Sequence, residues 1–193
     1  MSEIRYTIEF FNEWHCGSGL AAGAGVDSLV IKDRNNLPFV PGKTVKGLVR
    51  KAVEELLLFY NKEDKDTLNK NIIKTFGFFD ENKDTAEKGT AFFTNAELSK
   101  EEQKAIISNQ LSKYMYTSIF STAIDKEGIA VEHSLRSMET VVPCSLQGKI
   151  LEIPDENIKK IIIKSLGMIK RIGQNSNRGL GRCTFNITEG GEK

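Results

Sequence analysis

Two segments of the chain carry apolar residues at helical spacing, and each lies between strand-like patterns. The first runs from about Pro41 to Tyr60, and the second runs from Ile158 to Ile169. In both, apolar residues recur at i, i+3, i+4 and i+7, which is typical of a helix that buries one face. The predicted inward positions are Val45, Leu48, Val49, Ala52, Val53 and Leu56 in the first helix, and Ile158, Ile161, Ile162 and Leu166 in the second.

Four strand patterns lie before, between and after these two helical segments. Residues 4–12 alternate apolar and polar side chains, which is the period of a half-buried strand. Strand character returns over Thr90–Leu98, Met138–Glu152 and Arg182–Ile187. The order is therefore strand, helix, strand, long excursion, strand, helix, strand. We predict an α+β fold of the ferredoxin-like (RRM-like) βαββαβ class, with both helices on one face of an antiparallel sheet, in a single domain of residues 1–193.

Two insertions are expected in this core. Residues 62–88 are rich in lysine and acidic residues, which predicts a surface insertion with one helical piece around Leu68–Phe76. Residues 111–136 have an irregular pattern with Gly128 as a hinge. A loop of that length is uncommon in a small domain unless it has a function, so the second insertion is a candidate for a functional role.

The charge of the chain is balanced overall but segregated along the sequence. Its 193 residues are 39% hydrophobic and 27% charged, with a net charge of +1, as in an ordinary soluble globular protein. Residues 54–102 contain twelve acidic residues against seven lysines, whereas Asn157–Thr188 contain no acidic residue. A role with nucleic acid therefore depends on local charge, and the cations of the acid-free stretch are Lys159, Lys160, Lys164, Lys170, Arg171, Arg178 and Arg182.

The sequence argues against a membrane partner and against a disulfide or zinc framework. No apolar run approaches the ~20 residues that a membrane span requires, and charged residues interrupt the N-terminal segment that a signal peptide would keep apolar. The cysteines Cys16, Cys144 and Cys183 are scattered and form no CxxC pair. We expect free thiols and a cytoplasmic location.

A glycine-rich segment near the C-terminus, residues 172–182, is polar and basic. Glycines let backbone amides approach a polyanion, and arginines add fixed charge and planar donors. This composition is typical of a phosphate-backbone contact, although the segment alone fits a glycine-rich hairpin beside a solvated helix equally well. The residues of this segment predicted to contact a phosphate backbone are Asn177, Arg178, Gly179, Gly181 and Arg182.

A second set of cations recurs at helical spacing near the start of the first helix. Lys43, Lys46 and Arg50 lie on a face different from the apolar one, and the free amides of a helix start would add to their field. We predict that they contact a phosphate backbone, with ordinary solvated charge as the alternative. The prediction requires the helix start and the tail turn to border one continuous groove.

Several motifs along the chain are found together in one family. His15–Gly19 is followed by Gly25–Asp33, and Leu37–Arg50 is similar to a block written P-x-I-P-G-S-S-L-K-G-x-L-R. The tail Gly173–Arg182 matches a glycine-rich loop, and Leu135–Glu139 also has a counterpart. In these motifs the chain resembles the RAMP superfamily, the repeat-associated RNA-binding proteins of CRISPR systems. The closest likeness is to the backbone subunits of type III Csm and Cmr effector complexes.

The resemblance implies a subunit that stacks in several copies along a guide RNA (crRNA), together with other effector subunits. The excursion of residues 111–136 would be a thumb that wedges between the guide and a complementary target RNA, and His15 would contact RNA. Asp27 stands where active members carry an aspartate that is needed to cut the target, so the resemblance makes it the catalytic residue and the ligand of Mg²⁺ or another divalent cation. The chain is short for an active member, and Lys43 replaces a usual serine, so a cap-like subunit that binds RNA without cutting is the alternative.

The chemistry open to Asp27 follows from its carboxylate. It could hold a hydrated Mg²⁺ whose shell a phosphate completes, or it could orient the attacking 2′-hydroxyl, and the products would be a 2′,3′-cyclic phosphate and a 5′-hydroxyl. From the residues alone, Asp27 is a loop residue that caps a backbone amide, and only the resemblance favours cleavage. A metal-independent acid/base pair of His15 and His133, as in guide-processing RAMP ribonucleases, is a further alternative.

Overall fold

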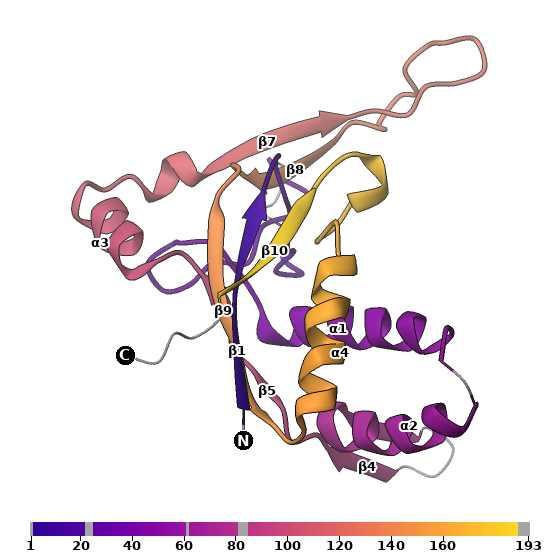
Figure 1. Cartoon of the computed structure of the whole chain (residues 1–193). Helices are drawn as coiled ribbons and strands as arrows, with labels where there is room; N and C mark the ends of the chain where they lie inside the picture. Colours follow the sequence, from indigo (N-terminus) through magenta and orange to yellow (C-terminus); the bar gives the residue numbers. More distant parts are fainter. Residues whose placement is uncertain (1, 22–24, 61, 81–84, 189–193) are drawn as a thin grey trace.

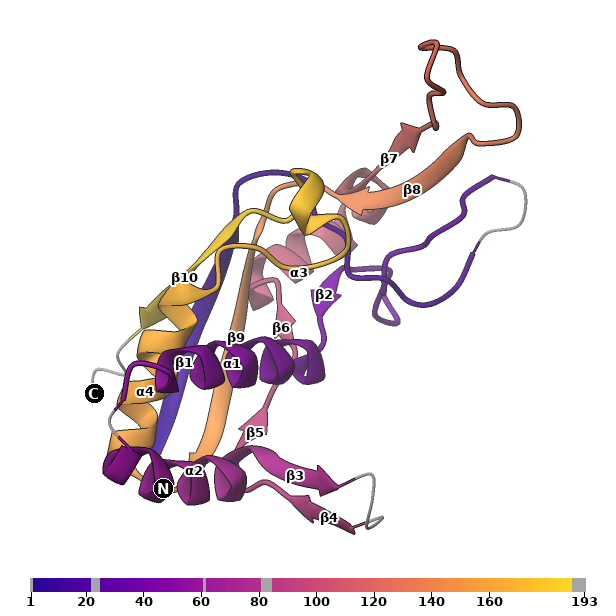
Figure 2. The same cartoon turned by 90° about the vertical axis from the view of Figure 1, so that its right-hand side faces the viewer.

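The computed structural model describes residues 2–21, 25–60, 62–80 and 85–188. Figures 1 and 2 show a sheet with helices on one side and a long hairpin that projects from its upper end. The elements are β1 (Ser2–Phe10), β2 (Phe39–Val40), α1 (Gly42–Leu57), α2 (Lys62–Phe76), β3 (Gly77–Asp80), β4 (Thr85–Lys88), β5 (Phe92–Phe93), β6 (Ala96–Glu97), α3 (Lys100–Ser108), the 3₁₀ turn η1 (Ser112–Met115), β7 (Tyr116–Ser121), β8 (Arg136–Val141), β9 (Ser145–Ile153), α4 (Glu156–Met168), the 3₁₀ turn η2 (Ser176–Arg178) and β10 (Cys183–Thr188).

The central sheet has the strand order β10-β1-β9-β6-β2, and β5 also pairs with β9. Every pairing is antiparallel, and β1 lies between β9 and β10. The first strand is therefore flanked by the third and fourth strands of the βαββαβ order, which is the split βαβ arrangement. Figure 1 places α1 and α4 on the same face of the sheet. The predicted α+β architecture is confirmed.

The core lies between this face and the helices. In β1 the side chains of Ile4, Tyr6, Ile8 and Phe10 are buried, and those between them are more exposed, as the two-residue period predicts. All four predicted inward residues of α4 are buried, as are Val45, Val49, Ala52 and Val53 of α1, while Leu48 and Leu56 are partly buried. Burying each such side chain contributes about 1.5–3 kcal/mol, so the helix stripes explain why the two helices dock here.

The predicted strand Thr90–Leu98 is divided into β5 and β6. Thr94 and Asn95 separate the two, because their side chains replace ladder contacts: Lys149 N donates to Thr94 Oγ1 at 2.9 Å, and Gly42 N donates to Asn95 Oδ1 at 3.0 Å. Polar side chains of this kind compete with regular backbone pairing. The second contact caps the start of α1, so the break in the strand positions that helix.

The segment 62–88 contains more structure than was predicted. Its helix α2 begins at Lys62, and β3 and β4 form a two-stranded hairpin after it. Ile72 and Phe76 of α2 are buried in the core, and Phe76 contacts Phe93 with ring centroids 5.8 Å apart. The prediction of a surface insertion was therefore wrong for the C-terminal half of this helix.

The excursion predicted as irregular is a β-hairpin. Its strands β7 and β8 pair from Tyr116 opposite Val141 to Ser121 opposite Arg136. The predicted strand Met138–Glu152 is thus two strands, since β8 belongs to the hairpin and β9 to the central sheet. Pro143, which lacks a backbone N–H and cannot continue a ladder, lies in the break between them.

The three cysteines are free, as predicted, and Cys16 and Cys183 are buried. Burial raises the pKa of the Cys16 thiol to about 12, and the neighbouring Cys183 adds to the rise. Within the described ranges, no helix has both the length and the apolar character of a membrane span.

Candidate nucleic-acid interface

The loop that carries Asp27 is attached to β8 at the root of the hairpin. Asp27 N donates to Ser137 O at 3.0 Å, and Ser137 N donates to Asp27 Oδ2 at 2.7 Å. One residue further on, Glu139 N donates to Ser28 O at 3.0 Å. These bonds join two segments more than 100 residues apart, so the position of Asp27 depends on that of the hairpin.

Glu139 holds the same loop through its side chain. Its Oε1 lies 2.7 Å from Lys32 Nζ, and its Oε2 accepts from Val30 N at 3.1 Å. The side chains of Glu139 and Lys32 are only 14% and 27% exposed, so the pair is shielded from water. Loss of either residue would leave the charge of the other uncompensated. Lys32 Nζ also lies 3.9 Å from the centroid of the Tyr116 ring, which belongs to β7. The network therefore ties both hairpin strands to the loop.

Tyr116 completes this network. Its hydroxyl donates to Asn36 O at 2.8 Å. Burial raises the pKa of Tyr116, and the charge of Glu139 adds to the rise. The phenol therefore stays protonated near neutral pH, where it donates its hydrogen bond and forms no ion pair with Lys32.

His15 is fully buried beneath the loop. Its Nδ1 lies 2.6 Å from Glu139 O, and a carbonyl only accepts, so Nδ1 carries the proton. In the neutral ring Nε2 is then an acceptor, and Ser28 Oγ donates to it at 3.1 Å. The ring thus positions Ser28, next to Asp27. This burial argues against the predicted direct contact of His15 with RNA, and the engaged nitrogens argue against an acid/base pair with His133, which lies exposed in the hairpin.

A pocket of about 490 Å³ opens beside Asp27 and is called the Asp27 pocket below. The hairpin supplies Arg136 to this pocket. The loop of residues 173–182, called the tail loop below, supplies Asn175 and Arg178. Asp27 itself is exposed, and its Oδ2 accepts from Ser137 N. Among the residues that the structure describes, Oδ1 has no hydrogen-bond partner. Figures 1 and 2 both place the hairpin root and the tail loop at the same end of the molecule. The pocket therefore gathers two guanidinium groups and one carboxylate at an open surface.

The tail loop takes its shape from residues in the left-handed region. Asn175 and Gly179 flank η2 with φ values of 56° and 98°. Gly181 has φ +67°, and a Cβ there would lie 1.9 Å from Ile172 O, so only glycine fits. Gly181 is buried and its N–H donates to Glu13 O at 2.8 Å, which makes its role structural. At Gly179 an added Cβ would meet nothing within 4 Å, so its backbone is open to a ligand.

The other predicted residues of the tail are exposed but lie outside the Asp27 pocket. Asn177 and Arg182 both face solvent. Arg182 N donates to Asn12 Oδ1 at 2.8 Å, and its guanidinium lies 6.0 Å from the centroid of the Phe11 ring. Asn12 Nδ2 also donates to Gly179 O, so Asn12 closes the loop from the end of β1.

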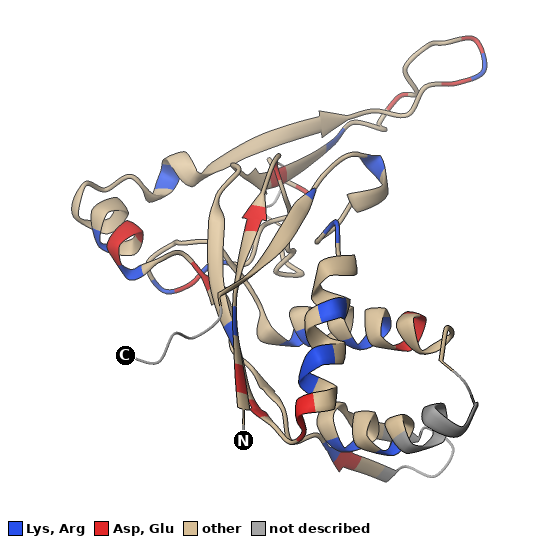
Figure 3. Cartoon of the chain, viewed as in Figure 1, with Lys and Arg blue, Asp and Glu red and all other residues tan. Residues whose placement is uncertain are grey.

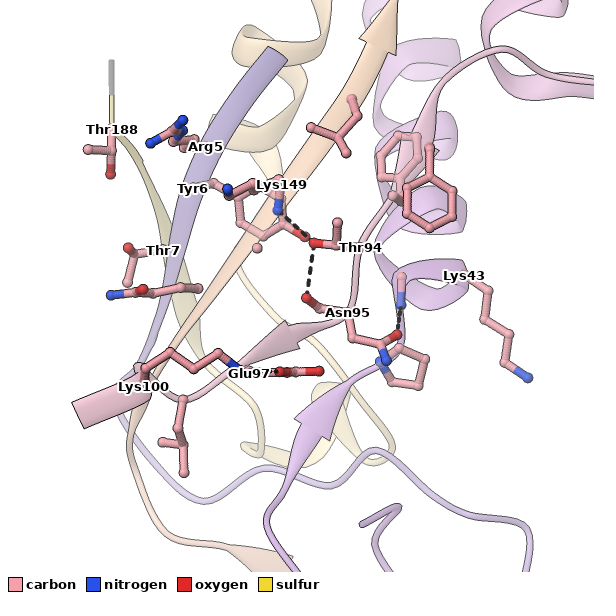
Figure 4. Close-up of a pocket in the computed structure, with 18 residues that line it drawn as sticks. Arg5, Tyr6, Thr7, Lys43, Thr94, Asn95, Glu97, Lys100, Lys149 and Thr188 are labelled. Carbon is pink, nitrogen blue, oxygen red and sulfur yellow. Dashed lines mark hydrogen bonds and ion pairs between the residues drawn. The ribbon is translucent and has the colours of Figure 1, made fainter. Parts of the chain in front are cut away.

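Lys43, Lys46 and Arg50, called the α1 cations below, lie elsewhere. Lys43 is exposed and borders a hollow of about 1180 Å³ that residues of β1, β5 and β9 also line, and Figure 4 shows it pointing away from Lys149. Partial burial lowers the pKa of Lys46, and the charges of Arg50 and Lys88 lower it further. Arg50 Nε lies 3.1 Å from Glu54 Oε1 in an exposed pair. Like charges are thus crowded on this helix.

The two regions of the predicted groove border different cavities. Arg178 borders the Asp27 pocket, whereas Lys43 borders the hollow on the sheet, and neither of the two cavities contains residues of both regions. Figures 1 and 2 agree that α1 crosses the middle of the molecule, below the end that carries the tail loop. Figure 3 colours Lys and Arg blue, and blue segments of the backbone lie both on the helices and at that upper end. Lys43 and Arg178 therefore border two separate cavities among the described residues.

The donor set around Asp27 limits a metal ion to one protein carboxylate. Across the described ranges, no three His, Cys, Asp or Glu residues gather as metal ligands. Mg²⁺ often binds through one or two carboxylates plus substrate phosphates and water. The residues therefore fit a Mg²⁺ ion only when a phosphate group supplies further ligands.

The comparisons with known proteins agree with this architecture. The sequence matches the RAMP superfamily over residues 7–184, and the chain therefore belongs to that superfamily. In fold it is similar to a chain from the cryo-EM structure of the type III-B Cmr-beta bound to cognate target RNA, with a TM-score of 0.70, 12% identity and coverage of 97% of both chains. A chain of the apo state of the type III-B Cmr-beta gives a TM-score of 0.67 at 12% identity, with coverage of 97% and 98%. No protein with curated annotation matches the sequence.

Sequence reasoning assigned no role to Arg136, Asn175 or Glu139. Arg136 and Glu139 fall in the motif Leu135–Glu139 that resembles the family, but nothing in the pattern indicates that it faces Asp27. The alternation of β8 puts residues 137 and 139 on one face, which is a signal for the contacts of Ser137 and Glu139 with the loop but not for Arg136.

Proposed function

We propose that the chain is a guide-RNA-binding backbone subunit of a type III CRISPR effector complex, which cleaves complementary target RNA at Asp27. Its partners are then a crRNA, the target RNA, other effector subunits and further copies of itself. The observation that carries the proposal is the exposed carboxylate of Asp27, which shares a pocket with Arg136 and Arg178 at the root of a projecting hairpin. Membership of the superfamily and the fold shared with Cmr-beta chains support it.

RNA would be bound at two regions in this proposal. The α1 cations contact the phosphate backbone of the guide without reading its sequence, because lysine and arginine there meet no base-shaped pocket. The tail loop presents Asn177, Arg178 and the open amide of Gly179 to the same strand or to its complement. The hairpin separates guide and target, and its root brings the target to Asp27.

The cleavage step follows from what Asp27 can do. Its free oxygen accepts the hydrogen bond of a ribose 2′-hydroxyl, which aligns that oxygen with the adjacent phosphorus. A bond forms from the 2′-oxygen to phosphorus as the bond to the next 5′-oxygen breaks. The 2′-proton passes to the carboxylate or to water, and the leaving oxygen takes a proton from water. A bound Mg²⁺ would stabilise the charge on the phosphate.

A second candidate is a subunit that binds RNA without cutting it. The observation in its favour is the hydrogen bond from Ser137 N to Asp27 Oδ2, because a carboxylate that caps a backbone amide needs no catalytic role. A histidine-dependent ribonuclease is less consistent with the burial of His15 and the two hydrogen bonds of its ring.

The test is to purify the protein with its bound nucleic acid, identify that nucleic acid, and assay cleavage of complementary RNA with and without Mg²⁺. The wild-type complex should yield a 2′,3′-cyclic phosphate, and Asp27→Ala should stop the reaction. Asp27→Asn is the matched variant, since its amide oxygen can still accept from Ser137 N while the charge is lost. Cleavage that persists in both variants at the wild-type rate would leave only the non-cutting subunit.

A further inference from the structure

We infer that Arg136 and Arg178 form a binding site for the phosphate backbone of the RNA strand that passes Asp27. The hairpin would then supply a charged group to the cutting site in addition to separating strands. This inference rests on the proposed function and names the groups that bind its substrate.

Arg136 has a fixed place relative to Asp27. It is the first residue of β8 and pairs with Ser121 of β7, so its backbone is held in the hairpin ladder. The next residue, Ser137, exchanges two hydrogen bonds with Asp27. Since Arg136 precedes the anchor of the Asp27 loop by one residue, the start of β8 and the loop are held together, and Arg136 and Asp27 line the same pocket.

Arg178 is presented by a loop whose backbone is also fixed. Arg178 N donates to Asn175 O at 2.8 Å, and the left-handed residues Asn175 and Gly179 flank the turn. Asn175 borders the same pocket and lies 3.8 Å from Met138 Sδ through its Nδ2, which joins the tail loop to β8. The two arginines therefore approach one pocket from different segments.

Both guanidinium groups keep their donors available. Within the described part of the chain, neither Arg136 nor Arg178 forms an ion pair, and Asp27 directs Oδ2 to Ser137 N instead. A planar guanidinium offers paired donors that match the oxygens of a phosphate, and it does not lose its charge at any working pH. Two such groups around one carboxylate give the pocket a positive excess.

The chemistry of the pocket favours a phosphodiester of single-stranded RNA as the ligand. The arginines match the phosphates, the Asn175 amide and Ser28 can bond a ribose, and the apolar side chains of Ile119 and Met138 can cover a sugar or base. An acidic peptide would use the arginines only and would leave this apolar wall without a partner. The pocket also lies open to a strand held by the hairpin.

The experiment measures binding of a labelled target strand to the guide-loaded complex, in an Asp27→Asn background that removes cleavage from the readout. Arg136→Ala and Arg178→Ala should each lower affinity by about 3- to 10-fold, and each should reduce the slope of log K against log[salt] by about 0.7, the value for one single-strand phosphate contact. Arg136→Lys should retain part of the affinity. The matched control is Lys104→Ala, a cation exposed on α3 away from the pocket, which should change neither quantity.

Affinities and salt slopes of both arginine variants equal to those of Lys104→Ala would overturn the inference. Failure of the proposed cleavage is a separate outcome, because it appears as Asp27→Asn cutting normally in the wild-type arginine background. Purification of each variant with the same amount of guide RNA as the wild type shows that the complex has assembled.

Discussion

The Asp27 pocket and the α1 cations are both basic, but they are built differently. In the pocket, the carboxylate of Asp27 and the loop around it are fixed by hydrogen bonds to β8 and by the shielded Glu139–Lys32 pair. On α1, Lys46 lies among like charges that lower its pKa, and Arg50 has only an exposed partner one helical turn away. A positioned group is typical of a site for chemistry, whereas crowded exposed cations are typical of backbone binding.

The two regions therefore contribute differently to the stability of the fold. Residues of the pocket network stabilise the fold and position the loop, so their removal should affect both folding and cleavage. Of the α1 cations, Arg50 forms an exposed pair with Glu54 that contributes about 0.3–0.5 kcal/mol. Their removal should therefore affect RNA binding far more than stability.

The largest effect is expected for Glu139→Ala. It leaves Lys32 without its partner and Val30 N without an acceptor, which should lower the free energy of unfolding by about 3 kcal/mol. Cleavage should fall as well, because the Asp27 loop loses its anchor. Chemical denaturation checks the stability, and the matched control is Glu54→Ala, whose exposed pair with Arg50 should cost only about 0.3–0.5 kcal/mol. Equal costs for the two variants would contradict the contrast between the regions.

A smaller effect is expected in the tail loop. Gly181→Ala places a Cβ against Ile172 O at a positive φ, so the free energy of unfolding should fall by about 2 kcal/mol and the loop should shift. Gly179→Ala meets no atom, and only its left-handed conformation should cost about 1 kcal/mol. Thermal unfolding of the two variants compares them directly. A Gly179→Ala variant as unstable as Gly181→Ala would show that the loop does not pack as described.

A binding effect without a stability effect is expected for Lys46→Ala. Loss of one phosphate contact should weaken guide RNA about threefold and flatten the salt dependence by roughly 0.7 per contact. The free energy of unfolding should stay the same or rise slightly, since a crowded charge is removed. Fluorescence anisotropy at several salt concentrations measures the RNA affinity and its salt dependence. Chemical denaturation measures the free energy of unfolding. Reduced stability with unchanged RNA affinity would place Lys46 among structural residues.

The smallest effect is a pH dependence that originates at Lys46. Its pKa is lowered in the folded state, so the unfolded chain binds more protons as pH rises through the folded pKa toward that of a free lysine. Stability should therefore rise slightly with pH in that window, and RNA affinity should fall there as the charge is lost. Lys46→Met should remove both changes. Identical pH profiles for the wild type and Lys46→Met would contradict the assignment.

The elements with strong periodicity could be predicted from the sequence. The apolar stripes of α1 and α4 and the alternation of β1 are local patterns, and they led to the correct α+β class. Asp33 was also recognisable as a turn residue, since its Oδ1 accepts from Asn35 N and Leu37 N at 2.8 Å. The break at Pro143 and the division at Thr94–Asn95 were missed, because the competing side-chain contacts come from distant strands.

The site was harder to predict than the fold. Asp27, Arg136 and Arg178 are far apart in the sequence and meet only through the hairpin and the tail loop. His15 is polar and lies beside glycines, so its burial by Glu139 and Ser28 could not be recognised locally. That Lys43 and Arg178 border different cavities could not be predicted for the same reason, because charge along the chain does not fix its place on the surface.

The most direct test of the account compares Asp27→Asn with Lys46→Ala in single-turnover cleavage at saturating target RNA. Asp27→Asn should bind guide and target normally but cut about 100-fold or more slowly, as expected for loss of a positioned acid/base group. Lys46→Ala should cut at the wild-type rate once bound RNA is saturated. If Asp27→Asn cuts as fast as the wild type, or if Lys46→Ala is the slower of the two at saturation, chemistry does not take place in the Asp27 pocket.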